Sequence, residues 1–255
     1  MLESLQGRLI FGRTTRIRTL QPGPHASSYR RESHELRRPD GAELEGWSAV
    51  PMDRPTAGVL LYFGGRNENV VWAPDMASFN PGWAVYAFNY RGFGESTGRA
   101  SERRAKDDAR AILEFATARE WTATLAIVGR SLGTAIALDL AREAKPQRLV
   151  LMSPFESVPK VLRTRPLGRI GASLVTQRFA CADLAAAHHG QALVLLAGTD
   201  DSVPHEQSRR LCERLPHRPA LRTIAGTTHQ SLPRSGSAQR AIAGYLPSTF
   251  MPRSA

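Results

Sequence analysis

The sequence is poor in cysteine and contains no long apolar run. Its two cysteines, Cys181 and Cys212, lie far apart in the 255 residues, so neither a disulfide framework nor a paired-cysteine metal site is expected. No stretch reaches the roughly 18 apolar residues that a membrane-spanning helix needs. Residues 1–20 also lack the apolar core and cleavage site of a signal peptide. We therefore expect a cytoplasmic protein that binds no metal.

Motifs for nucleotide and zinc chemistry are also missing. The chain has no G-x-x-x-x-G-K-[ST] loop and no H-E-x-x-H helix, which argues against nucleotide hydrolysis and zinc proteolysis. Gly92-Phe93-Gly94 resembles the start of a dinucleotide fingerprint. The next glycine, Gly98, comes one residue too late for that fingerprint. We expect no cofactor.

Acidic residues are scarce relative to basic ones, and the net charge is +11. Residues 1–38 hold eight arginines against three glutamates. We expect residues 1–27 to form a basic N-terminal arm in solvent, with at most a weak attraction to anionic surfaces. Nucleic-acid modules usually interleave such charge with exposed aromatic residues, and here only Phe11 and Tyr29 are present. No nucleic-acid partner is expected.

The hydrophobic pattern predicts one α/β domain over residues 28–255, because a chain of this length can bury a single large core. Asp40-Gly41 suits a tight turn and predicts a β-hairpin over Ser28–Val50. After it, short apolar runs alternate with segments of helical period, which is typical of a parallel sheet with strands buried on both faces. The predicted strands are 58–63, 83–90, 125–128, 149–152, 192–197 and 221–224, and the predicted helices are 101–120, 131–143, 203–215 and 237–246.

The stretch Pro154–His189 breaks this alternation, because it is much longer than a usual connection. It carries two weakly amphipathic pieces, Val158–Leu162 and Ile170–Phe179. Long insertions in compact domains are often lids or binding loops. We expect residues 154–189 to form a short cap over the functional site.

The pentapeptide Gly129-Arg130-Ser131-Leu132-Gly133 matches G-x-S-x-G. Such a match arises by chance about one time in ten in a chain of this length, so its context decides. It directly follows a predicted strand and directly opens a predicted helix, as a nucleophile elbow requires. Glycines are needed there because a Cβ would clash with the neighbouring strand and helix. The amide of Leu132 and the helix N-terminus would stabilise an oxyanion.

The chain resembles the α/β-hydrolase superfamily from about Ser48 to Leu246. Three blocks carry the resemblance: Asn89–Ser96 after the fourth strand, the elbow at 129–133, and Ser153-Pro154-Phe155 at the start of the cap. It looks most similar to short-capped esterase and thioesterase-like members. The resemblance implies a mostly parallel central sheet with an N-terminal antiparallel hairpin and helices on both faces. It also implies a Ser, acid, His triad in that chain order.

The acid implied by the resemblance lies in the loop that follows the strand 192–197. Counting back from Val203-Pro204 favours Asp200, whereas counting forward from Gly198 favours Asp201. Either carboxylate would have to lie close to the imidazole to orient it. We favour Asp200 and keep Asp201 as the alternative acid.

Among the seven histidines, only His229 follows both the acid and the last predicted strand, in a loop of small residues. We therefore predict His229 as the catalytic base. We expect His188, His189 and His205 to be solvated. His217 comes before the last strand and so lies on the wrong side of the sheet.

The resemblance places the second oxyanion donor in the loop after the third strand, Phe63–Asn67. Gly64 replaces the histidine that the family often carries there, and by this register Arg66 supplies its backbone N–H, together with that of Leu132. Any residue except proline can play this role. We expect Arg130 to form a surface salt bridge or, with Arg66, to bind an anionic group of the substrate.

These residues together predict a serine hydrolase that cleaves small carboxylic esters or thioesters through an acyl-enzyme formed on Ser131. A serine peptidase is the alternative enzyme, because some relatives with similar motifs cleave short peptides. A non-catalytic binding protein with this fold is the second alternative, although such a protein would be expected to lack a triad residue.

Overall fold

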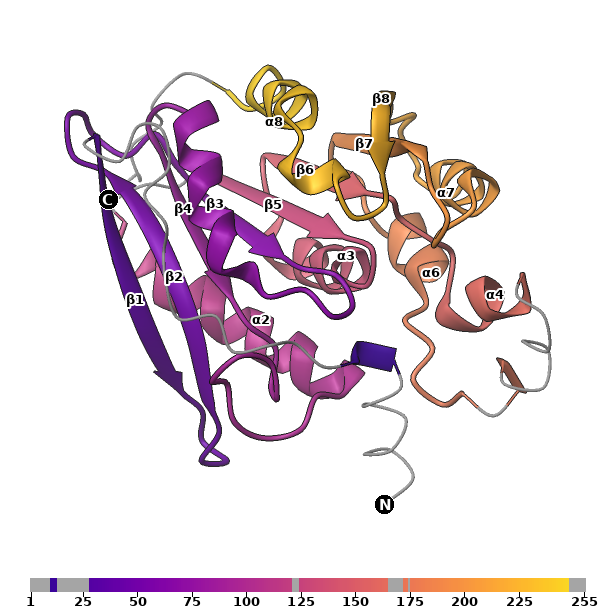
Figure 1. Ribbon diagram of the computed structural model, residues 1–255, viewed down its shortest axis with the longest axis horizontal. Helices are drawn as coiled ribbons and strands as arrows, with labels where there is room; N and C mark the ends of the chain where they lie inside the picture. Colours follow the sequence, from indigo (N-terminus) through magenta and orange to yellow (C-terminus); the bar gives the residue numbers. More distant parts are fainter. Residues whose placement is uncertain (1–9, 13–27, 121–123, 165–171, 174, 248–255) are drawn as a thin grey trace.

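The computed structural model describes residues 10–12, 28–120, 124–164, 172–173 and 175–247 (Figure 1). Its centre is an eight-stranded sheet in the order β1-β2-β4-β3-β5-β6-β7-β8. Strand β2 is antiparallel to both β1 and β4, and the remaining pairs are parallel. The strands are β1 (Tyr29–Arg37), β2 (Glu43–Pro51), β3 (Gly58–Phe63), β4 (Trp83–Phe88), β5 (Leu125–Arg130), β6 (Arg148–Met152), β7 (Ala192–Thr199) and β8 (Ala220–Thr228).

The predicted hairpin is confirmed as β1 and β2, paired from Tyr29 opposite Pro51 to Arg37 opposite Glu43. Gly41 in the connecting turn has a φ of +79°, a conformation that glycine adopts without steric cost. Strand β2 joins the hairpin to β4, so the antiparallel part of the sheet continues into the parallel part.

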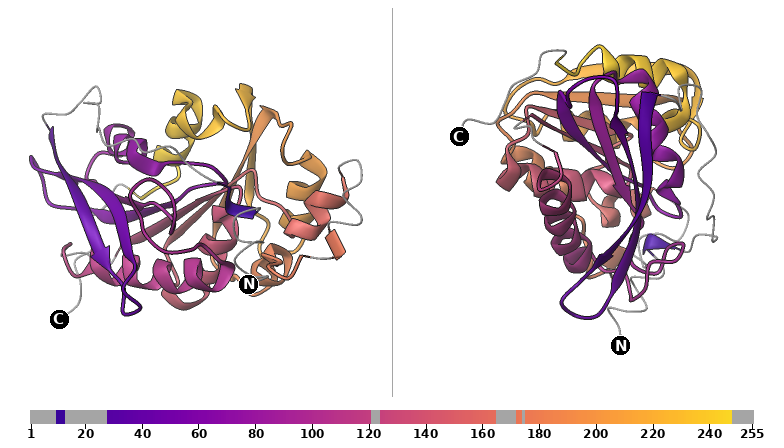
Figure 2. Two further views of the ribbon diagram at one scale, coloured as in Figure 1. Left: turned by 60° about the horizontal axis from the view of Figure 1, so that its bottom comes forward. Right: turned by 90° about the vertical axis from the view of Figure 1, so that its left-hand side faces the viewer.

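Helices cover both faces of the sheet, as predicted. They are α2 (Glu102–Thr117), α3 (Gly133–Ala144), α4 (Val158–Arg163), α6 (Cys181–Ala186), α7 (His205–Cys212) and α8 (Gly236–Ala243), with 3-10 segments η2 (Val70–Phe79) and η3 (Leu232–Arg234). Helices α2, α3 and α6 contribute to one apolar core, and η2 and α8 to a second core. Figure 2 shows α2 and α8 on opposite sides of the sheet. Strands β3, β4 and β5 are therefore buried throughout.

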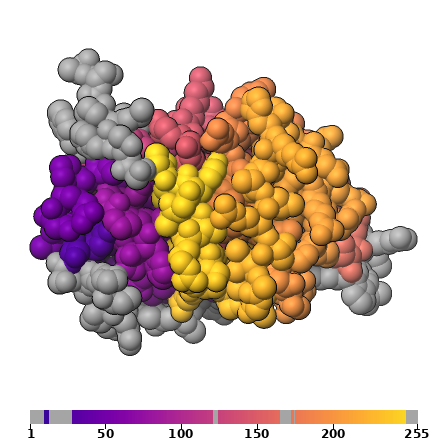
Figure 3. Space-filling model, turned by 90° about the horizontal axis from the view of Figure 1, so that it is seen from above, coloured from indigo at the N-terminus to yellow at the C-terminus, as the bar shows by residue number. Residues whose placement is uncertain are grey.

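Helix boundaries follow the capping residues. Ser101 has extended backbone geometry, and its hydroxyl accepts a hydrogen bond from the Arg104 amide at 3.3 Å, which starts α2 where the sequence predicted it. Ser235 caps α8 in the same way through the amide of Ala238. Figure 3 shows α8, in yellow, on the surface between the N-terminal half of the chain and the orange β7–α7 region.

The last strand differs from expectation. We expected residues 221–224 to be buried on both faces, but in β8 only Ile224 and Thr227 are buried and Leu221 is 44% exposed. Strand β8 lies at the edge of the sheet and pairs only with β7. An edge strand has a single neighbour, so its side chains are less completely covered.

The predicted cap is only partly described, because residues 165–171 and 174 lie outside the described residues. Its first amphipathic piece forms α4, as expected. In the second piece, Ile170–Phe179, residues 172–173 are helical and residues 175–179 have no regular secondary structure; the next helix, α6, begins at Cys181. Helix α6 packs against α3 and α7, so this end of the insertion belongs to the main core. No helix in the described part of the chain is long and apolar enough to cross a membrane.

Residues 10–12 differ from the solvent-exposed arm that we expected over residues 1–27; the rest of that arm lies outside the described residues. The Phe11 side chain is fully buried. Its ring makes edge contacts with the rings of Tyr90, Phe93 and Phe179, at centroid distances of 5.3, 6.3 and 5.6 Å. Such aromatic contacts add to the free energy gained by burying the ring. Phe11 therefore joins the segment at residues 10–12 to the loop after β4 and to the cap.

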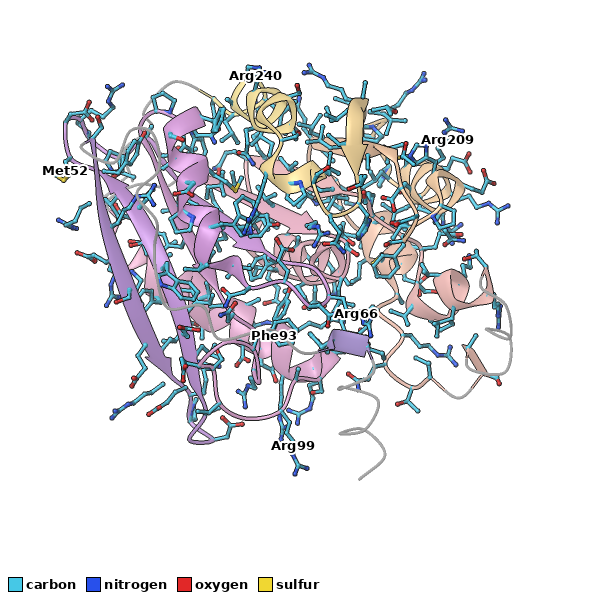
Figure 4. All side chains as sticks on the ribbon, in the orientation of Figure 1. Met52, Arg66, Phe93, Arg99, Arg209 and Arg240 are labelled. Atoms are coloured by element: carbon cyan, nitrogen blue, oxygen red, sulfur yellow. The ribbon has the colours of Figure 1, made fainter. Side chains whose placement is uncertain are left out.

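We predict that Phe11→Ala lowers the free energy of unfolding by about 3–5 kcal/mol, because it leaves a cavity among three aromatic rings. Urea denaturation monitored by circular dichroism measures this change. Met52→Ala is the control, since Met52 is 64% exposed (Figure 4), and its stability should match the wild type. Equal stability of the two variants would contradict the packing role of Phe11.

Candidate functional site

The turn between β5 and α3 has the geometry of a nucleophile elbow. Ser131 has a φ of +49°, a left-handed conformation that is uncommon for a residue with a side chain and persists only when its surroundings impose it. A Cβ on Gly129 would lie 2.6 Å from Ala137 Cβ, and a Cβ on Gly133 would lie 2.6 Å from the Gly64 carbonyl oxygen. The glycines of the pentapeptide therefore permit the close approach of strand, helix and the loop after β3.

An acid and a histidine meet at the carboxyl end of β7. His229 Nδ1 lies 2.9 Å from Asp200 Oδ2, and the two side chains are 6% and 1% exposed. Asp200 Oδ1 accepts hydrogen bonds from the amides of Ser202 and Val203, at 3.0 and 2.8 Å. Asp201 is exposed and accepts a hydrogen bond from the Ser202 hydroxyl. Of the two predicted acids, Asp200 is the one in contact with His229.

The electrostatics of Asp200 fix the proton on the histidine. Burial alone would raise the pKa of the Asp200 carboxyl, but hydrogen bonds from His229 and the Val203 amide outweigh it and lower the pKa to about 2. An ionised carboxylate can only accept hydrogen bonds. Nδ1 of His229 therefore donates to Asp200, and Nε2 is the ring nitrogen with a free lone pair that can take up a proton.

The loop after β3 lies against the elbow. A Cβ on Gly65 would lie 3.2 Å from Ser131 Cβ. The Gly65 amide donates to Glu68 Oε2 at 2.6 Å, and the Asn67 amide donates to the Phe11 carbonyl at 2.9 Å. Between them, the Arg66 amide makes no recorded hydrogen bond to another described residue. Figure 4 shows Arg66 beside the segment at residues 10–12.

Arg130 corrects our expectation of a surface salt bridge. The side chain is only 3% exposed, so its salt bridge is buried. Both Nη atoms bond to groups of the chain itself rather than being directed at an anionic group of the substrate. Nη1 lies 2.8 Å from Glu68 Oε2, and Nη2 donates to the His229 carbonyl at 2.7 Å. Burial alone would lower the pKa of Arg130, but the Glu68 carboxylate outweighs it and the pKa is raised.

Glu68 is a residue of this site that the sequence reasoning missed. No motif marks it, because it lies in an irregular loop outside the pentapeptide. One signal was available: an arginine at the end of a strand buried on both faces needs a carboxylate partner, and Glu68 is the acid in the adjoining loop.

Two other histidines also differ from expectation. His188 is buried rather than solvated, and mainly for that reason its pKa is lowered. His205 is half-buried, and its Nε2 lies 2.7 Å from the Ala197 carbonyl oxygen. Within the described ranges, no group of three or more His, Cys, Asp or Glu side chains could hold a metal ion.

The residues at this end of the sheet include groups suited to acyl transfer. They are a serine on a left-handed turn, an imidazole in contact with a carboxylate, and a loop after β3 that lies against the serine. The fold and this arrangement together define the class of α/β-hydrolases, in which a nucleophile lies between a central strand and the following helix.

Comparisons with known proteins agree with this class. A family model described as serine aminopeptidase, S33, matches residues 54–180. An uncharacterized protein of Mycobacterium tuberculosis is 33% identical over 219 residues, which cover 82% of this chain and 74% of that protein. Lysophosphatidylserine lipase ABHD12 of Gallus gallus is 37% identical over 94 residues, which cover 35% of this chain and 25% of the lipase.

Solved structures show the same fold. An esterase from Pyrococcus furiosus is similar with a TM-score of 0.71 and 17% identity, over 91% of this chain and 96% of the esterase. Acetyl xylan esterase from Paenibacillus sp. R4 has a TM-score of 0.68 and 18% identity, over 91% of this chain and 88% of that enzyme. The chain belongs to the α/β-hydrolase superfamily.

The pKa of Asp200 predicts a pH dependence of stability. The carboxyl has a pKa of about 2 in the folded protein, below its usual 3.8. As the pH falls from about 5 to about 2, the unfolded chain binds the proton first, and the stability contributed by ionised Asp200 is lost. Over this range the wild type should lose about 2 kcal/mol more than Asp200→Asn. Urea denaturation at each pH measures the stability of both proteins. Parallel curves of stability against pH would contradict the lowered pKa of Asp200.

Proposed function

We propose that the protein is a serine hydrolase that cleaves carboxylic esters or thioesters of small acyl substrates, with Ser131 as nucleophile, His229 as general base and Asp200 as the acid. The observation that carries this proposal is the 2.9 Å contact between Asp200 and His229. It lies at the carboxyl end of the parallel strands, as does the left-handed Ser131. The esterase and lipase type of the relatives supports the reaction class.

The reaction begins when Ser131 Oγ attacks the acyl carbonyl and passes its proton to Nε2 of His229. The tetrahedral intermediate carries a negative oxygen, which the amides of Arg66 and Leu132 stabilise. His229 then protonates the leaving alcohol or thiol, and the acyl-enzyme remains on Ser131. Water, activated by the same imidazole, releases the acid. Asp200 holds the imidazole and balances its charge in both halves of the reaction.

Three observations support the two oxyanion donors. The amides on either side of Arg66 are already bonded, whereas that of Arg66 has no recorded partner in the described part of the chain. Leu132 immediately precedes α3, where the first amides lack partners within the helix. The helix N-terminus adds a partial positive charge at the same place.

A serine peptidase is the second candidate, because the matching family model is described as a serine aminopeptidase. Peptidase and esterase share the acyl-enzyme chemistry and differ in the leaving group. Turnover of an aminoacyl p-nitroanilide in preference to a p-nitrophenyl acyl ester would favour the peptidase. A non-catalytic binding protein is disfavoured because serine, acid and histidine are all present, and absence of turnover on both substrates would favour it.

We predict that Ser131→Ala abolishes labelling by a fluorophosphonate probe and lowers kcat for p-nitrophenyl butyrate by at least about 10⁴-fold, because the attacking oxygen is removed. Ser78→Ala is the control, since Ser78 lies in η2 and its hydroxyl donates to the Asp75 carbonyl at 2.6 Å. It should be labelled like the wild type. Undiminished labelling of Ser131→Ala would disprove the nucleophile.

The two neighbouring acids give a second test. Asp200→Asn should lower kcat by about 10³- to 10⁴-fold, because the amide no longer fixes the imidazole in the required tautomer. Asp201→Asn should change kcat by no more than about threefold, since Asp201 is exposed. Steady-state kinetics on the same ester measure both variants. A larger loss in Asp201→Asn would reverse the assignment.

A further inference from the structure

A buried ion pair connects two of the loops that surround Ser131. Glu68 Oε2 accepts from the Gly65 amide at 2.6 Å and from Arg130 Nη1 at 2.8 Å. Arg130 Nη2 then donates to the His229 carbonyl at 2.7 Å and to Gln230 Oε1 at 3.3 Å. One continuous chain of hydrogen bonds thus runs from the loop after β3, through the residue next to Ser131, to the backbone of His229.

The pair is fixed in position by its surroundings. Glu68 Oε1 accepts from the Tyr62 hydroxyl at 2.8 Å and from Trp72 Nε1 at 3.2 Å, so both carboxylate oxygens are occupied. The Arg130 and Glu68 side chains are 3% and 9% exposed. Such a buried pair does not exchange its hydrogen bonds for hydrogen bonds to water, so the packing around it sets its geometry.

The backbone hydrogen bond between Gly65 and Glu68 sets the direction of the Arg66 amide. The Gly65 carbonyl accepts from the Glu68 amide at 3.4 Å, so it points back into the loop. In a planar trans peptide the C=O and the following N–H point in opposite directions. The Arg66 N–H therefore points away from the interior of the loop, and a Cβ on the preceding Gly65 would lie 3.2 Å from Ser131 Cβ.

A second buried ion pair in the fold differs from the Glu68–Arg130 pair in the residues that it contacts. Arg91 and Asp108 form an ion pair of similar burial, with side chains 6% and 5% exposed. Its further contacts are Arg38 and Asp40, at the hairpin turn. Buried ion pairs contribute little net stability, because desolvation offsets their attraction. Stability alone therefore does not account for a pair that bonds to both site loops.

We propose that Glu68 and Arg130 are positioning residues that hold the Arg66 amide and the His229 imidazole at fixed positions relative to Ser131. The inference rests on the proposed function. Glu68 fixes the backbone on the oxyanion side, and Arg130 fixes the backbone of His229 on the base side. Both side chains are buried, so we expect the pair to affect the stability of the transition state and to leave substrate binding unchanged.

The test uses Glu68→Gln and Arg130→Lys in the full chain, with p-nitrophenyl butyrate as substrate. Glutamine keeps the shape of Glu68 but loses its charge, and the single ammonium of lysine cannot span both Glu68 and the His229 carbonyl. We expect kcat to fall about 10- to 100-fold, with KM within about twofold. The affinity for butyl boronic acid, a mimic of the tetrahedral intermediate, should fall by the same factor as kcat/KM.

Asp108→Asn is the matched control, because it removes the negative charge of a buried ion pair whose further hydrogen bonds run to Arg38 and Asp40 at the hairpin turn. Its unfolding midpoint should shift as far as that of Glu68→Gln, while its kcat stays within about twofold of the wild type. A role for Glu68 in folding alone would make both variants equally active, and that result would overturn the proposal.

The double variant Glu68→Gln/Arg130→Met keeps the proposal testable if a single variant does not fold, since no buried charge is left unpaired. We expect it to be more stable than Glu68→Gln but to remain about 10- to 100-fold slow, because methionine cannot donate to the His229 carbonyl. Wild-type kcat in the double variant would overturn the proposal. Wild-type protein without ester turnover or fluorophosphonate labelling would instead overturn the proposed function, and this inference with it.

Discussion

The ends of β3 and β5 and the start of α3 approach so closely that Gly129 and Gly133 have no room for a side chain. Between these two glycines Ser131 adopts a left-handed conformation, and α3 begins at Gly133. Strands β3, β5, β7 and β8 all run in the same direction, so the loops that follow them lie at the same end of the sheet. The remainder of the site is arranged around a turn that cannot relax without moving a strand.

The buried charges at the site are paired, although the overall charge of the protein is +11. Asp200 is held ionised by hydrogen bonds from His229 and from backbone amides, and Arg130 is held by Glu68. Because an unpaired charge is costly away from water, each pair restricts the loops that carry it. The same interactions that make these charges tolerable therefore also define the geometry of the proposed reaction.

The N-terminal segment at residues 10–12 extends this arrangement beyond the sheet. Phe11 packs on rings from the loop after β4 and from the cap, and its carbonyl accepts a hydrogen bond from the Asn67 amide in the loop after β3. A stretch of chain whose composition indicated only solvent exposure thus contributes to the core. Composition averages over a segment, whereas burial depends on the partners that the fold places beside each residue.

The sequence by itself determined the local features: alternating apolar runs predicted the strands and helices, Asp40-Gly41 predicted the hairpin, and the glycines of the pentapeptide predicted the elbow. These signals are short-range, so they can be read from neighbouring residues. Tertiary structure decided that Asp200 rather than Asp201 faces His229, that β8 is an exposed edge, and that Arg130 turns inward to Glu68. Those outcomes depend on contacts between residues far apart in the chain, such as the 62 positions that separate Glu68 from Arg130, and no local pattern encodes them.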